Sequence, residues 1–216
     1  MRQISITLLL ASLFLAAIIF VAGISIGKLI DTGNTDQFDQ KITSLSDRTN
    51  ANMLVALLEN SPEYCPFFKE ELDNVENDTN YLGYQIAYLE DAKGVQDDAL
   101  KTRYFALELS SYLFSNKVRS TCNENFSTVI YFYSNKNCFL ECRDQGAQLL
   151  GLKNIPGVWV KVYSFDNEIG SSSAKLLADK YNVTKYPTVI VNGAKYEGVQ
   201  SKDQLVEEVG VAQNNS

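Results

Sequence analysis

Four cysteines are the residues best suited to chemistry in this chain, which contains no histidine. Without histidine the chain has no Ser-His-Asp or Cys-His catalysis, no imidazole proton shuttle and no zinc site that uses imidazole. Two of the cysteines, Cys138 and Cys142, lie close together in the stretch NKNCFLECRDQG, separated by three residues. A thiol pair this close is a candidate for thiol-disulfide exchange, in which one thiolate attacks a disulfide and a second thiol resolves the mixed disulfide.

The other two cysteines, Cys65 and Cys122, flank a segment that reads as helical. A bond between them closes a loop of about 58 residues and contributes about 4 kcal/mol in the chain-entropy model. We predict a structural disulfide. The alternative is a relay that passes electrons between these cysteines and Cys138. Because the four cysteines lack the paired Cys-x-x-Cys spacing of structural zinc sites, we expect no metal.

The elements that must position Cys138 and Cys142 follow an α/β order. Runs rich in β-branched and aromatic residues predict strands in 127–134, 157–165 and 188–199, the last divided into a hairpin by Asn192-Gly193. Helical patterns lie between them and after them, in 142–152, in 171–181 and from Ser201, where Gln204 completes a capping box, to a point before Gly210. The order β-α-β-α-β-β-α predicts two parallel strands joined by a right-handed crossover, and then an antiparallel hairpin.

Two motifs carry a resemblance to a known family: VIYFYSNKNCFLEC, a strand that leads into the cysteine pair, and KYPTVIVNG, in which a proline immediately precedes a strand. With these motifs, residues 125–211 resemble the thioredoxin superfamily, and within it the glutaredoxin-like minimal core. The resemblance implies a thioredoxin-like mixed sheet and a thiol-disulfide oxidoreductase that needs no metal or organic cofactor. It also implies that Pro187 is a cis proline facing the cysteines and that the backbone of Tyr186 holds a peptide substrate. The alternative is a trans proline that opens an edge strand.

The helical pattern and the resemblance together divide the roles of the two thiols. Cys142 falls on the apolar stripe and is assigned as the resolving thiol, whereas Cys138, at the exposed start of the helix, is assigned as the nucleophile. The spacing is one residue longer than the family's Cys-x-x-Cys. In a regular helix the two Cβ atoms would lie about 5 to 6 Å apart, whereas a disulfide requires roughly 3.8 Å. A bond is therefore expected to need a bulge or a helix that starts after Leu140.

A second departure from the family concerns the buried carboxylate that thioredoxins carry before the motif. Aromatic residues, Tyr131 or Phe132, stand there instead. This departure and the unusual spacing leave two further hypotheses. One is a redox-inactive thioredoxin-fold module that binds peptides or acts as a scaffold, with structural cysteines. The other is a redox sensor whose Cys138–Cys142 bond opens reversibly.

The N-terminal residues predict a membrane anchor. Residues 4–27 carry no charge and would span roughly 36 Å as a helix, enough to cross a bilayer. A cleaved signal peptide is the alternative. We predict an anchor in 1–27, a juxtamembrane stalk in 28–50, a helical segment in 51–124 and a thioredoxin-like domain in 125–213.

The anchor and the cysteines place the domain on the extracytoplasmic side of the cell membrane, where disulfides persist. The expected partners are therefore protein thiols or disulfides and, as the resemblance implies, a redox partner in the membrane. A net charge of −7 without a strongly basic run argues against a nucleic-acid partner.

Overall fold

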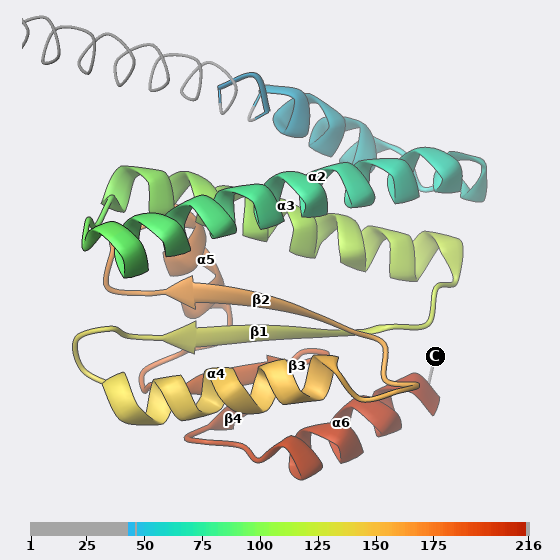
Figure 1. The fold of residues 1–216 in the computed structure, drawn as a ribbon. Helices are drawn as coiled ribbons and strands as arrows, with labels where there is room; N and C mark the ends of the chain where they lie inside the picture. Colours follow the sequence, from blue (N-terminus) through green and yellow to red (C-terminus); the bar gives the residue numbers. More distant parts are fainter. Residues whose placement is uncertain (1–42, 46, 215–216) are drawn as a thin grey trace, which may run out of the picture. The chain divides into compact units, whose positions relative to one another are not determined.

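The computed structural model describes residues 43–45 and 47–214, of which residues 47–214 belong to one compact unit (Figure 1). A first helix covers residues 47–58. The elements that follow are η1 (Pro62–Tyr64), α2 (Cys65–Ala87), the π-helical turn η2 (Tyr88–Ala92), α3 (Asp98–Cys122), β1 (Ser127–Tyr133), α4 (Phe139–Lys153), β2 (Val160–Asp166), α5 (Ser172–Lys180), β3 (Thr188–Val191), β4 (Ala194–Glu197) and α6 (Lys202–Asn214).

A four-stranded mixed sheet has the strand order β2-β1-β3-β4. β1 pairs with β2 in parallel, from Ser127 opposite Val160 to Tyr133 opposite Asp166, and with β3 antiparallel. β3 and β4 form a hairpin whose turn uses positive φ angles, 47° at Asn192 and 96° at Gly193. The predicted order β-α-β-α-β-β-α is confirmed from β1 onward.

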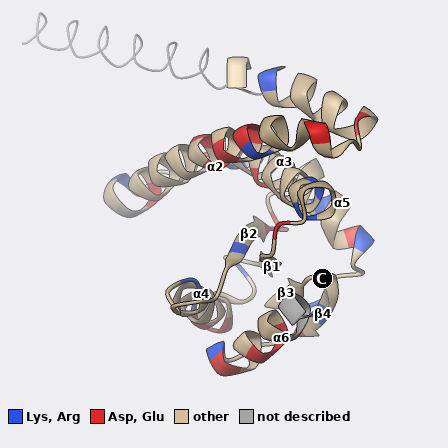
Figure 2. Ribbon diagram, turned by 90° about the vertical axis from the view of Figure 1, so that its right-hand side faces the viewer, with Lys and Arg blue, Asp and Glu red and all other residues tan. Residues whose placement is uncertain are grey.

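Helices cover both faces of the sheet, with α4 and α6 on one side and α3 and α5 on the other (Figure 2). The alternation of strand side chains explains these two layers, because successive residues point to opposite faces. Ile130, Phe132 and Phe165 pack with α3 and α5, whereas Val129 and Val189 pack with α4 and α6.

The helical segment is a long hairpin of α2 and α3. Disulfide-bonded Cys65 and Cys122 join its ends, with their Cα atoms 5.5 Å apart. Phe68 and Phe114 are fully buried in the cluster that holds the two helices together. The helix over 47–58 begins inside the range predicted as a stalk, and its Thr49 is buried, so the helical layer starts earlier than expected.

Two boundaries differ from the sequence prediction. β2 begins at Val160, so Trp159 precedes the strand, and α6 continues through Gly210 to Asn214. The capping box is present: the Ser201 hydroxyl accepts from the Gln204 N–H, and the Gln204 side chain accepts from the Ser201 N–H.

The predicted membrane anchor, residues 4–27, lies outside the described residues, as does most of the predicted stalk. Within the described part of the chain, no helix combines the length and the apolar character that crossing a membrane requires.

Candidate active site around Cys138 and Cys142

Cys138 and Cys142 are joined by a disulfide at the start of α4, with their Cα atoms 5.4 Å apart. Cys138 is the N-cap residue, with a non-helical φ of −148°, and α4 begins immediately afterwards at Phe139. The carbonyl of Cys138 accepts the first helical hydrogen bond, from the N–H of Cys142, at 2.8 Å.

This geometry corrects two expectations. The bond needs neither a bulge nor a helix that starts after Leu140, because only Cys142 has helical geometry and the backbone of Cys138 turns out of the helix path. In addition, Cys138 is not exposed: its exposed fraction is 4%, close to the 5% of Cys142. The exposed residues are instead Phe139 and Leu140, which lie between the two cysteines.

Hydrogen bonds hold the loop that leads from β1 into the disulfide. The Ser134 hydroxyl accepts from the N–H groups of Lys136 and Asn137, at 3.2 and 2.8 Å. The Asn135 side chain donates to the Asp166 carboxylate at 3.1 Å, and the Asn137 side chain donates to Glu168. The β1–α4 loop is therefore tied to the loop that follows β2.

Asp166 is the buried carboxyl group of this network, 3% exposed at the end of β2. It also accepts the N–H of Glu168 at 3.0 Å. Burial raises the pKa of Asp166, while the Glu168 N–H and the Lys101 ammonium act in the opposite direction. Sequence reasoning did not single out Asp166, although its place at the carboxyl end of a parallel strand, where sites gather in α/β sheets, was a usable signal.

A pocket of about 360 Å³ lies beside Cys142, between α4 and the sheet. Tyr131 and Tyr133 form one wall, with ring centroids 5.4 Å apart, and Phe139 and Arg143 form another. The Tyr131 hydroxyl donates to the carbonyl of Cys142. Tyr131 therefore holds the backbone of the first turn of α4.

The Tyr186-Pro187 peptide bond is cis and directly precedes β3. The Tyr186 hydroxyl accepts a hydrogen bond of 2.7 Å from the side chain of Asn167, in the loop after β2. That loop also binds the β1–α4 loop through Asp166 and Glu168. The segment predicted to bind peptide is thus connected to the disulfide loop by way of the β2–α5 loop.

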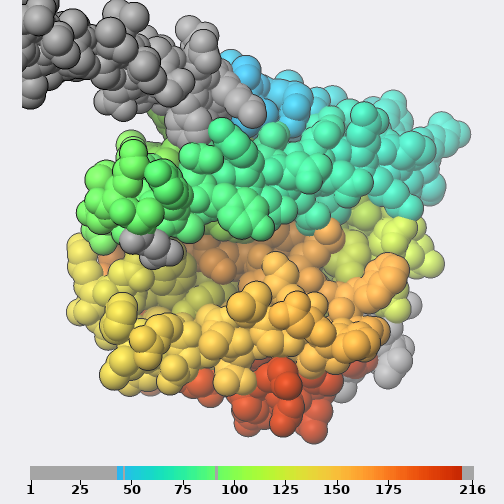
Figure 3. All heavy atoms as spheres, in the orientation of Figure 1, coloured from blue at the N-terminus to red at the C-terminus, as the bar shows by residue number. Residues whose placement is uncertain are grey.

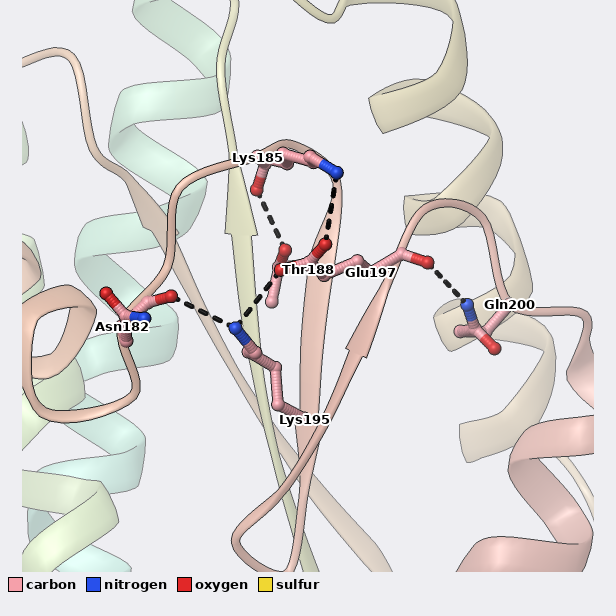
Figure 4. Close-up of polar contacts among 6 residues, drawn as sticks. All are labelled: Asn182, Lys185, Thr188, Lys195, Glu197 and Gln200. Atoms are coloured by element: carbon pink, nitrogen blue, oxygen red, sulfur yellow. Dashed lines mark hydrogen bonds and ion pairs between the residues drawn. The ribbon is translucent and has the colours of Figure 1, made fainter.

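Polar contacts with β4 fix the segment that carries Tyr186 (Figure 4). Lys195 donates to the carbonyl of Asn182 at 3.0 Å and to the Glu197 carboxylate at 3.1 Å. Lys185 pairs with Glu197, and its carbonyl accepts from the Thr188 hydroxyl at 2.8 Å. Hydrogen bonding from Lys195 holds the pKa of Glu197 below its usual range, so this carboxylate stays ionised.

The Cys65–Cys122 disulfide lies at the opposite end of the sheet from Cys138. Cys122 ends α3 before β1, and Cys138 follows β1, so the seven residues of the strand separate the two disulfides by about 20 Å. Thiol exchange requires contact between sulfur atoms. This separation argues against a direct electron relay between the two pairs.

A further buried carboxyl group escaped sequence reasoning. Glu108 of α3 accepts from the Tyr104 hydroxyl and from the N–H of Ser164 in β2. Burial raises the pKa of Glu108 to about 8, although both hydrogen bonds oppose this. The i, i+4 spacing of Tyr104 and Glu108 within the helical segment was the available signal.

Comparisons with known proteins were made against family models, curated proteins and solved structures. No family model matches the chain, and no curated protein matches it. Among solved structures, one described as a malarial protein is 22% identical with a TM-score of 0.35, covering 41% of this chain and 98% of its own. Thioredoxin-2, a component of malaria parasite protein secretion machinery, is 23% identical with a TM-score of 0.35, covering 44% of this chain and 90% of its own.

Chloroplastic thioredoxin z is 17% identical with a TM-score of 0.35, covering 46% of this chain and 89% of its own. Likeness at this level says nothing about activity, so the chemistry rests on the geometry of the site.

Proposed function

We propose that the chain is a thiol-disulfide oxidoreductase that acts on protein thiols and disulfides through Cys138 and Cys142. The observation that carries the proposal is the disulfide between the N-cap and the first turn of α4. Free N–H groups and the helix dipole favour a thiolate at such a position, which makes the sulfur both a good nucleophile and a good leaving group.

The exchange transfers two electrons and needs no cofactor. A substrate thiolate attacks Sγ of Cys138, the bond to Cys142 breaks, and the electron pair leaves on Sγ of Cys142. A second substrate thiolate then attacks the substrate sulfur of the mixed disulfide and releases Cys138 as a thiolate. The products are a substrate disulfide and a reduced cysteine pair. The reverse sequence reduces a substrate disulfide, with Cys138 as nucleophile and Cys142 as resolving thiol.

The proposal also includes a location at the cell membrane, a redox partner in that membrane and a contact for the peptide substrate. The uncharged residues 4–27 support anchoring in the cell membrane, with the domain on the extracytoplasmic side. There, a redox partner in the membrane would restore the cysteine pair after each turnover. The segment at Tyr186 and Pro187 is the proposed contact for the peptide substrate.

A trapping experiment tests this function. Cys142→Ala leaves Cys138 without its resolving thiol, so mixed disulfides with substrates persist and can be acid-trapped in the native host. We expect discrete protein adducts that disappear on reduction. The matched control, Cys142→Ala combined with Cys138→Ala, keeps the Cys65–Cys122 bond and should yield none.

A second function is favoured by one observation: both sulfurs belong to buried residues, 4% and 5% exposed. This burial suits a thioredoxin-fold module that binds peptides or acts as a scaffold, with Cys138–Cys142 as a structural bond. If the Cys142→Ala variant forms no adducts and its Cys138 alkylates no faster than free cysteine, this second function replaces the first.

A further inference from the structure

A groove runs along the free edge of β2, away from the Tyr186 segment. β2 is the outer strand of the sheet, and no other strand of the described chain pairs with its outer side. In the space-filling view the surface is hollowed between α2 and α4, with β2 at the bottom (Figure 3).

Three pockets lie in sequence along this strand. The first contains Ser164 and lies beside Cys142, the second contains residues 160–163, and the third contains residues 158–161. Their volumes are about 360, 210 and 430 Å³. The groove therefore follows β2 from Val160 to Ser164.

The register of the sheet determines which backbone groups of β2 face the groove. Ser127 donates its N–H to the carbonyl of Trp159, and Asn167 donates its N–H to the carbonyl of Tyr133. In a parallel ladder alternate residues bond to the neighbouring strand, so the odd-numbered residues of β2 face β1. The N–H and C=O groups of Val160, Val162 and Ser164 consequently point outward.

One of these outward groups already has a partner inside the protein. The N–H of Ser164 donates to the buried carboxyl group of Glu108. Val160 and Val162 lie further along the same edge, where the second pocket opens. Each presents one donor and one acceptor, the pattern that an added strand requires.

The charges on the α4 wall indicate the chemistry of the occupant. Arg143 lines the first pocket and Lys153 the second, and no acidic residue of α4 lines any of the three. Ten residues of helix separate the two cations by about 15 Å. Four residues of an extended strand span about 13 Å. In a bound extended peptide, acidic side chains at positions i and i+4 lie on the same face of the strand. They would therefore reach Arg143 and Lys153 together.

Of the acidic α2 residues that line the groove, Glu76 is neutralised by an ion pair, whereas Asp73 lies in the third pocket, so the acidic positions of an occupant belong beside the first two pockets. On α2, Glu76 pairs with Lys161 of β2 at 2.5 Å, and Lys69 pairs with Glu124 at 2.5 Å. The third pocket is largely apolar, with Leu72, Phe126 and Trp159 in its lining. It is large enough to receive an apolar side chain from the end of the same strand.

We propose that the free edge of β2 binds an extended acidic peptide segment of a partner protein as an added strand. Hydrogen bonds to Val160 and Val162 would supply sequence-independent affinity. Arg143 and Lys153 would select acidic residues four positions apart, and the third pocket would select an apolar residue.

Fluorescence of Trp159, the only tryptophan, provides the readout because this side chain lies in the third pocket and is 66% exposed. The probe is the acetylated and amidated peptide VTETVTETV, whose palindromic sequence fits either strand direction. When this peptide is titrated into the full-length chain in detergent, the Trp159 fluorescence should change and reach saturation at peptide concentrations below about 1 mM. The lysine analogue VTKTVTKTV should bind at least about tenfold more weakly.

Two N-methylated versions of the peptide test edge pairing without altering the protein. One carries methyl groups on the amides of the threonines, and the other carries them on the remaining alternate residues. An added strand turns only one set of amides toward its neighbour. One version should therefore lose binding at least about tenfold while the other retains it.

Charge-reversal variants test the contribution of α4. Arg143→Glu combined with Lys153→Glu should bind the lysine peptide and reject the acidic one. The control, Lys175→Glu combined with Lys180→Glu on α5, makes the same change in net charge and should leave both affinities unchanged. No saturable signal with the acidic peptide, equal binding of both N-methylated versions, or equal effects of the two double variants would each overturn the proposal.

Discussion

Asp166, the last residue of β2, and Glu108, on α3, are buried carboxyl groups, and both serve as hydrogen-bond acceptors that fix backbone. Asp166 accepts from Asn135 and Glu168 and so holds two loops at the disulfide end of the sheet. Glu108 accepts from Ser164 and so ties α3 to the strand edge. Both residues therefore fix backbone beside the pocket at Cys142, through Asn135 and Ser164.

The raised pKa of Glu108 predicts a pH-dependent stability. Its pKa is about 8 in the folded chain and about 4.3 when unfolded, so the folded state binds the extra proton between these values. The contribution of Glu108 to the free energy of unfolding should therefore be fully present below about pH 4.3. It should decrease as the pH rises from about 4.3 and be lost once the pH has passed about 8. Glu108→Gln keeps an acceptor for Tyr104 and Ser164 and should remove that decline.

Urea unfolding at a series of pH values between 5 and 9 measures this effect. The control is Glu207→Gln, because Glu207 is exposed on α6. A wild-type curve with the same pH profile as Glu108→Gln would show that the carboxyl group ionises normally in the folded chain.

At the scale of elements, the start of α4 decides whether Cys138 and Cys142 can bond. A regular helix over both residues would hold the sulfurs apart, but the N-cap position releases Cys138 from helical φ and ψ. The hairpin of α2 and α3 is closed in a different way, by a bond between residues 57 apart in sequence.

The two disulfides should therefore contribute different free energies. In the chain-entropy model, removing Cys65–Cys122 by Cys65→Ser with Cys122→Ser costs about 4 kcal/mol, whereas removing the short Cys138–Cys142 loop in the same way costs about 2 kcal/mol. Denaturant midpoints of the two double variants, at equal m-values, measure the difference. The expectation fails if loss of the short loop costs as much as loss of the long one.

At the scale of the whole molecule, α3 belongs to two hydrophobic clusters, one that it shares with the sheet and one that it shares with α2. Phe105 and Tyr112 of α3 pack with Phe132 and Phe165 of the sheet, and the rings of Phe105 and Phe165 lie 5.6 Å apart. The helical segment predicted as 51–124 is thus a layer over one face of the sheet. Because α3 packs against both α2 and the sheet, residues 47–214 form a single compact unit.

A core shared between layers predicts a single cooperative transition. Phe105→Ala should lower the free energy of unfolding by about 3 to 5 kcal/mol, because it leaves a cavity between α3 and the sheet. Far-ultraviolet circular dichroism monitors the loss of helix, and Trp159 fluorescence monitors the exposure of the sheet. The unfolding transitions measured by these two probes should have the same midpoint. Leu57→Ala, at a side chain that is 69% exposed, is the control. Separate midpoints in the wild-type chain would contradict the shared core.

Much of this fold could be predicted because its signals are local. The run of β-branched and aromatic residues in β1, the Asn192-Gly193 turn and the Ser201 cap each depend on neighbours a few positions away. The end of α6 was predicted too early, because Gly210 read as a stop and the helix continues through it. The burial of Cys138 was missed for a different reason: exposure depends on residues far away in sequence.

The sequence by itself determined that a closely spaced cysteine pair is present without any imidazole, and it determined the element order from β1 onward, because composition and periodicity reside in the chain. Only the tertiary structure decided that Cys138 caps α4 and bonds to Cys142, that Asp166 and Glu108 are buried, and that β2 keeps a free edge above a groove. Each of these depends on which elements pack together. The register of the sheet and the arrangement of the helical layers are set by contacts between residues distant in sequence.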